Sequence, residues 1–349
     1  MIVERRLSTA PPPSALRLRR PYLLFLADAQ SDPIAKTAFG VRDWAADASL
    51  AQWRMPGCEV DLKLPDMAPE AAAAAGAGSL VIGVAPAGGE IPRAWDPLLL
   101  RAVAAGLDIV SGMHVALSDV PGLAEAARRR SVALIDVRRP AREFPVATGR
   151  RRTGKRLLTV GTDCALGKKY TALALTNAMR ERRIEADFRA TGQTGIMING
   201  GGIAIDAIVA DFVAGAAEWL SPDAPDDHWD VIEGQGSLFH PAYAGVTLSL
   251  IHGSQPDVLI LCHDPTRTRI ASCPDFQIPT LETAAERYVQ AARLTNPSVR
   301  LAGVSLNTSS MGDETRARLI VDMERRMQVP CFDPLKTPLD GVVECVLDT

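Results

Sequence analysis

The sequence predicts an α/β fold built on parallel sheets, and three observations lead to this class. Short apolar runs alternate with segments of helical spacing along the chain. A glycine-rich stretch, residues 161–168, lies between one such run and an Ala/Leu-rich segment. The length of 349 residues exceeds the usual size of one domain. Because the composition shifts to Arg, Pro, Gly and Thr between residues 138 and 156, we predict domains at 1–150 and 151–349.

The N-terminal part has the pattern of a Rossmann-like domain. We expect strands in four apolar runs, at residues 22–29, 79–86, 107–112 and 132–137. Helical spacing predicts helices over residues 36–46 and 97–105, with short helices between the later strands. Since no G-x-G-x-x-G follows these strands, we predict no dinucleotide in this domain.

The stretch from Gly161 to Lys168 resembles the phosphate-loop motif G-x-x-x-x-G-K, with five residues instead of four between its glycines, and has a strand before it and a helix after it. Loop amides, the positive end of the helix and the Lys168 ammonium would converge on an anion. We expect Lys168 to be exposed, and an ordinary strand-to-helix turn is the alternative. The predicted phosphate site consists of Gly161, Thr162, Asp163, Cys164, Ala165, Leu166, Gly167, Lys168, Lys169 and Tyr170. The C-terminal domain is therefore predicted to be P-loop NTPase-like.

Lys169 departs from the full motif, because Ser or Thr normally follows the loop lysine and holds magnesium. An ammonium at that position opposes a divalent cation. The loop can therefore hold a polyphosphate, whereas magnesium-dependent NTP hydrolysis is disfavoured.

Acidic and basic residues at the ends of later apolar runs are further candidates for the site. Glu233 ends a run and is followed by Gly-x-Gly, the arrangement that faces bound phosphates from a neighbouring strand. Asp206 lies among apolar neighbours and is either a helix-start or partner-bound acid, or a functional one. Arg267 and Arg269 could bind a substrate carboxylate or lie at the surface, and Asn307 could bind a purine edge.

Composition limits the partners and the compartment. The 38 Lys and Arg residues against 41 Asp and Glu leave no basic field to attract nucleic acid or membrane. The six cysteines lack CxxC pairs, and we see neither a signal peptide nor an 18-residue apolar run, so we predict a cytoplasmic protein without a metal site. We also predict a homo-oligomer.

Two resemblances follow from these motifs. The loop with residues 231–236 resembles the dethiobiotin synthetase branch of phosphate-loop proteins, in which an acid at the position of Glu233 binds magnesium. Five blocks along nearly the whole chain are similar to the D-glutamate N-acetyltransferase family, a two-domain family formerly of unknown function. They are residues 83–86, 106–112, 161–169, 192–195 and 233–241. The second resemblance is the more specific, because it includes Lys169.

The second resemblance implies acetyl transfer from acetyl-CoA to the amine of an acidic amino acid, most specifically D-glutamate. The loop would then hold acetyl-CoA phosphates without magnesium. His240 is the first candidate for the general base, Glu233 the second, and Asp206 a further catalytic candidate, while His240 could instead be a structural histidine. Backbone amides near residues 192–195 or 234–237 could stabilise the oxyanion. Substrate contacts are predicted for Gln193, Thr194, Gln235, Ser237, Arg267 and Arg269. The alternatives are an ATP-dependent ligase or kinase that uses Mg-ATP, and a nucleotide-binding regulatory module.

Overall fold

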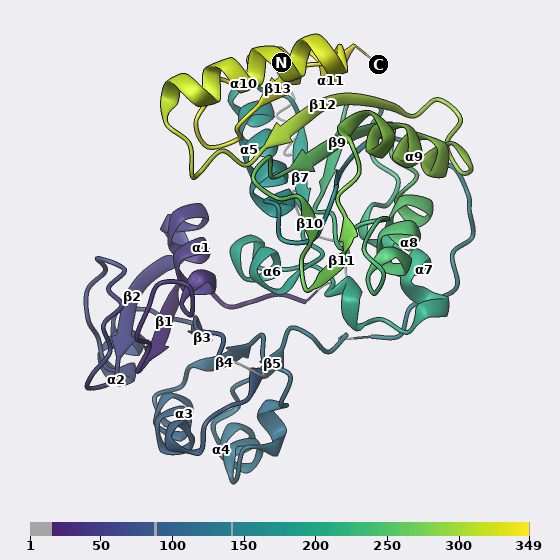
Figure 1. Cartoon of the computed structure of the whole chain (residues 1–349). Coiled ribbons are helices and arrows are strands. Elements are labelled where there is room, and N and C mark those ends of the chain that lie inside the picture. The colour runs from purple at the N-terminus through teal and green to yellow at the C-terminus, as the bar shows by residue number, and fades with distance from the viewer. Residues whose placement is uncertain (1–15, 87–88, 141, 349) are drawn as a thin grey trace, which may run out of the picture. The chain divides into compact units, whose positions relative to one another are not determined.

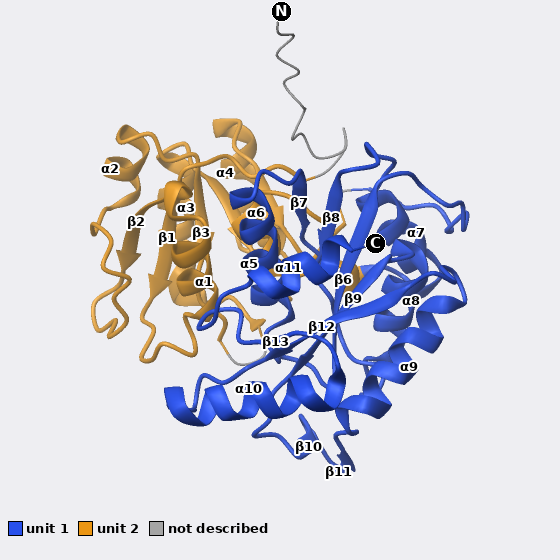
Figure 2. Ribbon diagram, turned by 90° about the horizontal axis from the view of Figure 1, so that it is seen from above, with its two compact units in different colours: residues 1–13, 142–191, 208–349 blue, residues 14–141, 192–207 orange. Residues whose placement is uncertain are grey.

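A computed structural model of the chain describes residues 16–86, 89–140 and 142–348 (Figure 1). Contacts divide the described residues into two compact units, which Figure 2 colours separately. The first unit consists of the described residues within Arg142–Thr191 and Ile208–Thr349. The second unit consists of those within Ser14–Ala141 and Gly192–Ala207. The segment Gly192–Ala207 thus interrupts the first unit in sequence and packs with the second.

The second unit contains a parallel sheet of five strands. These are β1 (Tyr22–Ala27), β2 (Ser49–Arg54), β3 (Ser79–Ile82), β4 (Asp108–Ser111) and β5 (Leu134–Asp136). Their order in the sheet is β2-β1-β3-β4-β5, and each adjacent pair is parallel. Every residue of β1 is buried, as in a strand with helices on both faces.

In the described part of this second unit there are five α-helices: α1 (Lys36–Trp44), α2 (Pro69–Ala74), α3 (Asp96–Ala104), α4 (Leu123–Arg130) and α6 (Gln193–Asn199). Its 3-10 turns include η1 (Ala46–Ala48), η3 (Arg93–Trp95), η4 (Leu117–Asp119) and η5 (Ile205–Ala207). Helices α2, α3 and α4 pack in sequence against one another, and α1 packs against α6. Arg20 binds the carbonyl of Ile198 near the end of α6, which joins α6 to the start of β1.

The first unit is built on a parallel sheet of six strands. They are β6 (Lys155–Gly161), β7 (Ala186–Arg189), β8 (Trp229–Ile232), β9 (Val258–His263), β12 (Arg300–Leu306) and β13 (Cys331–Phe332). The order is β13-β12-β9-β6-β8-β7, so the strand that precedes the glycine-rich loop has β8 and β9 as neighbours. A separate antiparallel hairpin consists of β10 (Arg269–Ile270) and β11 (Cys273–Gln277).

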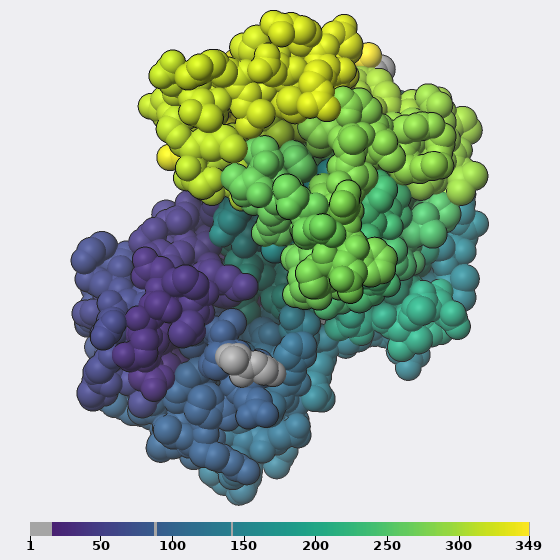
Figure 3. Space-filling view, in the orientation of Figure 1, coloured from purple at the N-terminus to yellow at the C-terminus, as the bar shows by residue number. Residues whose placement is uncertain are grey.

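Helices cover both faces of the six-stranded sheet. They are α5 (Lys168–Glu181), α7 (Ala210–Leu220), α8 (Ala244–Ser254), α9 (Leu281–Arg293), α10 (Asp313–Met327) and α11 (Asp340–Leu347). Helix α5 contacts β6, β7 and β8 and packs with α11, whereas α8 and α9 contact the sheet from β6 to β12. On that second side, Leu281, Ala284 and Tyr288 of α9 join the buried core with residues of β6, β9 and β12. Helix α10 lies at the surface of its unit, where its atoms are yellow in Figure 3, and of its residues only Arg316 is buried.

The predicted α/β class with parallel sheets is confirmed. The predicted strands are present with shifts of a few residues, while β2 and the β10–β11 hairpin were not predicted. Residues 192–195, whose backbone amides are candidate oxyanion donors, form the start of α6, a short helix from Gln193 to Asn199 that ends at Gly200 in the left-handed region. Among the helices that the structure describes, none is long and apolar enough to cross a membrane.

Candidate functional site

The glycine-rich loop connects the buried strand β6 to helix α5. Two of its residues, Ala165 with φ of 53° and Gly167 with φ of 108°, adopt the left-handed region. For Gly167 this conformation costs little, whereas the Cβ of Ala165 makes it unfavourable there. Alternation of right- and left-handed residues turns successive amides toward one side of a loop, which forms a concave site for an anion.

Amide groups of this loop are available for a ligand. The hydrogen bonds of α5 begin with the Thr171 N–H, which donates to the Gly167 carbonyl at 2.9 Å. The amides of Ala165, Leu166, Gly167 and Lys168 donate to no group among the residues described. Several N–H groups that have no acceptor within the protein (here called undonated amides) form a site for phosphate or another anion at a helix N-terminus.

The lysines at the start of α5 add positive charge to these amides. Lys168 is buried, with 7% of its surface exposed, and its Nζ donates to the Asp163 carbonyl at 2.8 Å. The prediction of an exposed Lys168 is therefore wrong, and burial lowers the pKa of its ammonium. Lys169 is half-buried, with its Nζ 4.3 Å from the centre of the Tyr170 ring. Two lysines in a first turn without acids oppose the helix dipole, an arrangement that a bound anion would stabilise.

Asp163 and Arg267 hold the loop from its other side. The Asp163 carboxylate is fully buried and accepts hydrogen bonds from the Cys164 N–H at 2.6 Å and the Ala271 N–H at 2.8 Å. Arg267 donates to the same carboxylate at 3.2 Å, to the Cys164 carbonyl at 2.9 Å and to the Ala165 carbonyl at 3.1 Å. Arg267, which we predicted to contact substrate, thus contacts the phosphate loop itself.

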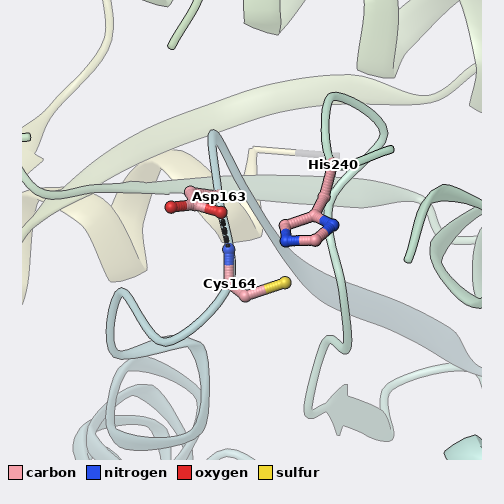
Figure 4. A group of neighbouring side chains, drawn as sticks. All are labelled: Asp163, Cys164 and His240. Carbon is pink, nitrogen blue, oxygen red and sulfur yellow. Dashed lines mark hydrogen bonds between the residues drawn. The ribbon is translucent and has the colours of Figure 1, made fainter. Parts of the chain in front are cut away.

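Asp163, Cys164 and His240 form a cluster beside the loop (Figure 4). One potential ligand atom from each side chain lies within 4.8 Å of the others, a spacing that could hold a metal ion. Burial raises the pKa of the Cys164 thiol, which favours its protonated form. The Asp163 carboxylate already bonds to Arg267 and two amides, and the ammonium of Lys168 is bonded to the adjacent carbonyl. These charges and bonds oppose a cation at the cluster.

Both ring nitrogens of His240 bond to the backbone. The side chain is 3% exposed; its Nδ1 accepts from the Ala242 N–H at 3.1 Å, which leaves the proton on Nε2 to donate to the Ala271 carbonyl at 3.2 Å. The Nδ1 lone pair becomes available to a substrate only if the bond from Ala242 opens. The assignment of His240 as the general base stays a prediction.

Glu233 follows β8, the strand that pairs in parallel with β6 as the sequence suggested. Its carboxylate is buried and accepts from the Thr191 N–H at 2.9 Å, at the end of the next strand, β7. Gln235 donates to the Thr191 hydroxyl at 3.1 Å. Ser237 is also buried, and its hydroxyl accepts from the Phe239 N–H at 3.2 Å. The turn after β8 is therefore bonded to Thr191 after β7 on one side. On the other side, its Gly234 N–H donates to the hydroxyl of Thr159 in β6 at 2.9 Å.

The remaining predicted site residues lie in different surroundings. Asn307 follows β12 and accepts from the Ser309 N–H at 3.2 Å. Arg269 is exposed in β10 and donates to the Pro274 carbonyl at 3.1 Å. Asp206 is exposed rather than buried among apolar residues; it pairs with Arg138 at 3.1 Å and accepts from Gln193. The Thr194 hydroxyl lies 3.4 Å from the Thr37 hydroxyl. Gln193, Thr194 and Asp206 all belong to the second unit.

Two residues near the loop were not identified from the sequence. The Tyr288 hydroxyl donates to the Gly161 carbonyl at 2.7 Å and accepts from the Leu238 N–H at 3.1 Å, and burial raises the pKa of Tyr288 to about 12. Its only sequence signal is a core position in an amphipathic helix. His263 ends β9, with its Nδ1 2.9 Å from the Thr162 hydroxyl, and burial lowers its pKa. A polar residue at the carboxyl end of a strand beside β6 could have indicated it.

Family models match most of the chain. A model described as a domain of unknown function, DUF1611_C P-loop domain, matches residues 145–343, and the DUF1611_N Rossmann-like domain matches residues 53–140. The chain belongs to the DUF1611 family. A crystal structure of a DUF1611 family protein from Anabaena variabilis has a TM-score of 0.82 and 32% identity, covering 95% of this chain and all of that one.

Two curated relatives of this DUF1611 chain have named activities. A D-glutamate N-acetyltransferase of Tritonibacter scottomollicae is 49% identical over 94% of this chain and 99% of the relative. A D-glutamate N-acetyltransferase of Pseudoalteromonas sp is 44% identical over 94% of this chain and 99% of the relative. Similarity of this extent supports an enzyme of the acyltransferase class, an N-acetyltransferase, and does not favour the ligase or kinase alternative.

Proposed function

We propose that the protein transfers the acetyl group of acetyl-CoA to the amine of D-glutamate. The observation that supports the proposal is the loop at residues 161–169, in which four amides without an acceptor among the described residues, together with the Lys168 ammonium, are available to bind an anion, while Lys169 stands where Ser or Thr would bind magnesium. The pyrophosphate of CoA needs such donors and no metal ion. The names of the two curated relatives support both the acetyl transfer and the acceptor.

The reaction joins an amine to a thioester carbonyl carbon. The neutral amine of D-glutamate forms a C–N bond with the acetyl carbon, the C–S bond breaks, and CoA leaves as its thiol after taking up a proton. A base must remove the proton that the amine loses, and N–H donors must stabilise the negative oxygen of the tetrahedral intermediate.

Phosphates in the loop would restrict where this chemistry occurs. The pantetheine arm separates the pyrophosphate of acetyl-CoA from its thioester, so the reacting carbon would lie well away from the phosphate loop. His240 adjoins Asp163 and Cys164 of that loop. For His240 to act as the base, the pantetheine arm would have to fold back toward the loop, and the hydrogen bond from the Ala242 N–H to Nδ1 would have to break. The two hydrogen bonds of the ring to the backbone instead suit a structural role beside the loop.

An assay with purified protein tests the proposed function. We expect N-acetylglutamate and free CoA to form in equal amounts from acetyl-CoA and D-glutamate, with EDTA leaving the rate unchanged. L-glutamate is the control for acceptor chirality. Formation of ADP or phosphate from Mg-ATP in step with a product, without acetyl transfer, would contradict the proposal.

Lys169→Ser tests what the loop binds. In a magnesium-dependent NTPase the serine would restore the missing metal ligand and should raise nucleotide hydrolysis. In the proposed acetyltransferase the change removes a positive charge near the phosphates of acetyl-CoA. We expect its KM for acetyl-CoA to rise, more at low salt than at high salt, because salt screens such interactions. A gain of ATP hydrolysis with an unchanged KM for acetyl-CoA would be the opposite result.

A further inference from the structure

We infer that Arg267 is a positioning residue, which sets the direction of the phosphate-loop amides and thereby the affinity for the donor's phosphates. Only the identity of the anion in this inference rests on the proposed function. The sequence suggested that Arg267 binds a substrate carboxylate, but its guanidinium is bonded to Asp163, Cys164 and Ala165 of the loop.

The direction of each loop amide follows from the carbonyl that shares its peptide plane. In a trans peptide the C=O and the next residue's N–H point in opposite directions. Arg267 holds the carbonyl of Cys164 and that of Ala165, at 2.9 and 3.1 Å. The N–H groups of Ala165 and Leu166 therefore point away from Arg267, and both are among the undonated amides of the anion site.

The conformation of Ala165 requires such support. Its φ of 53° is in the left-handed region, which is unfavourable for a residue with a Cβ atom. Bonds from one planar guanidinium to the carbonyls on both sides of this residue keep it in that region. A lysine ammonium cannot reproduce the fixed fork of donors, although it would supply the same charge.

Arg267 is itself held in place. Asp163, which has no exposed surface, accepts from Arg267 and from the Ala271 N–H of the segment that joins β10 and β11. A second carboxylate, Asp264, lies 3.4 Å from the Nε of Arg267. The arginine side chain is 29% exposed, so most of its surface is covered. The guanidinium is therefore held by two carboxylates as well as by the loop carbonyls.

Binding measurements on variants of the full chain test the inference. With CoA and, separately, inorganic pyrophosphate as titrants, we expect Arg267→Ala to weaken binding roughly 10- to 100-fold, the range for loss of charge-assisted hydrogen bonds. Arg267→Lys should show most of the same loss of affinity, because a positive charge alone does not hold the two carbonyls. Adding Ala165→Gly to Arg267→Ala should recover part of the affinity, because glycine adopts the left-handed region without support. Arg287→Ala, an exposed arginine of α9, is the matched control.

Kinetics separate positioning from direct contact with the amino acid. If Arg267 acts through the loop, KM for acetyl-CoA rises in Arg267→Ala, while KM for D-glutamate and kcat at saturating donor change little. An increase confined to KM for D-glutamate, with unchanged CoA and pyrophosphate affinity, would overturn the inference. Full affinity in Arg267→Lys would overturn it too. Because pyrophosphate binding needs no turnover, absence of acetyl transfer would count against the proposed function and leave this test intact.

Discussion

Gly234→Ala is expected to destabilise the first unit by about 3 kcal/mol or more and to abolish donor binding, because the new Cβ has no space. It would lie 1.7 Å from the Thr159 carbonyl oxygen and 3.2 Å from the Cδ of Lys168. The obstacle is the backbone of β6, so a side-chain rotation cannot relieve it. The end of β8 would have to move away from β6, breaking the 2.9 Å bond from the Gly234 N–H to the Thr159 hydroxyl.

Urea unfolding and CoA titration measure the two effects. Gly245→Ala is the matched control: Gly245 lies in α8, and an added Cβ there meets nothing within 4 Å. Alanine in a helix gains about 0.5 to 1 kcal/mol over glycine, so this variant should unfold at higher urea concentration. A Gly234→Ala protein as stable as the wild type, with normal CoA affinity, would show that β6 and β8 are not packed as described.

Lys168→Met is expected to weaken CoA binding roughly 10- to 100-fold, because it removes a charge-assisted bond to phosphate while keeping the length of the side chain. Stability of the unliganded protein should rise or stay unchanged. Burial lowers the pKa of Lys168, so at neutral pH the folded state carries the cost of a buried charge that the unfolded chain does not. Loss of the bond to the Asp163 carbonyl partly offsets that gain.

The same shift predicts the pH dependence. The unfolded lysine, with its ordinary pKa, binds more protons than the folded one between the two pKa values, so the wild-type free energy of unfolding should rise with pH through that window. CoA affinity should fall as pH rises through the lowered pKa, because phosphate needs the ammonium form. Lys168→Met should lack both trends, and Lys36→Met, at an exposed position, should keep them. Equal CoA affinity in Lys168→Met and wild type would remove Lys168 from the anion site.

Local patterns explain why much of the fold was predictable. An apolar run such as residues 258–263 forms a buried strand because both faces of a parallel sheet are covered, and this requirement is visible in the run itself. The edge strand β2 was missed because its sequence, SLAQWR, mixes polar residues with apolar ones. The helix α6 was missed because its start, Gly-Gln-Thr-Gly, has the composition of a turn, and packing against α1 stabilises it.

The sequence by itself determined the α/β class, the phosphate loop and the replacement of the magnesium ligand by Lys169, because each of these is a property of neighbouring residues. Tertiary structure decided the burial of Lys168, the bonds of both His240 nitrogens and the contact of Arg267 with Asp163, 104 residues away. Spacing along the chain does not encode such contacts. They depend on how β6, β8, β9 and the hairpin after β9 converge at one edge of the sheet, which only the packed sheet establishes.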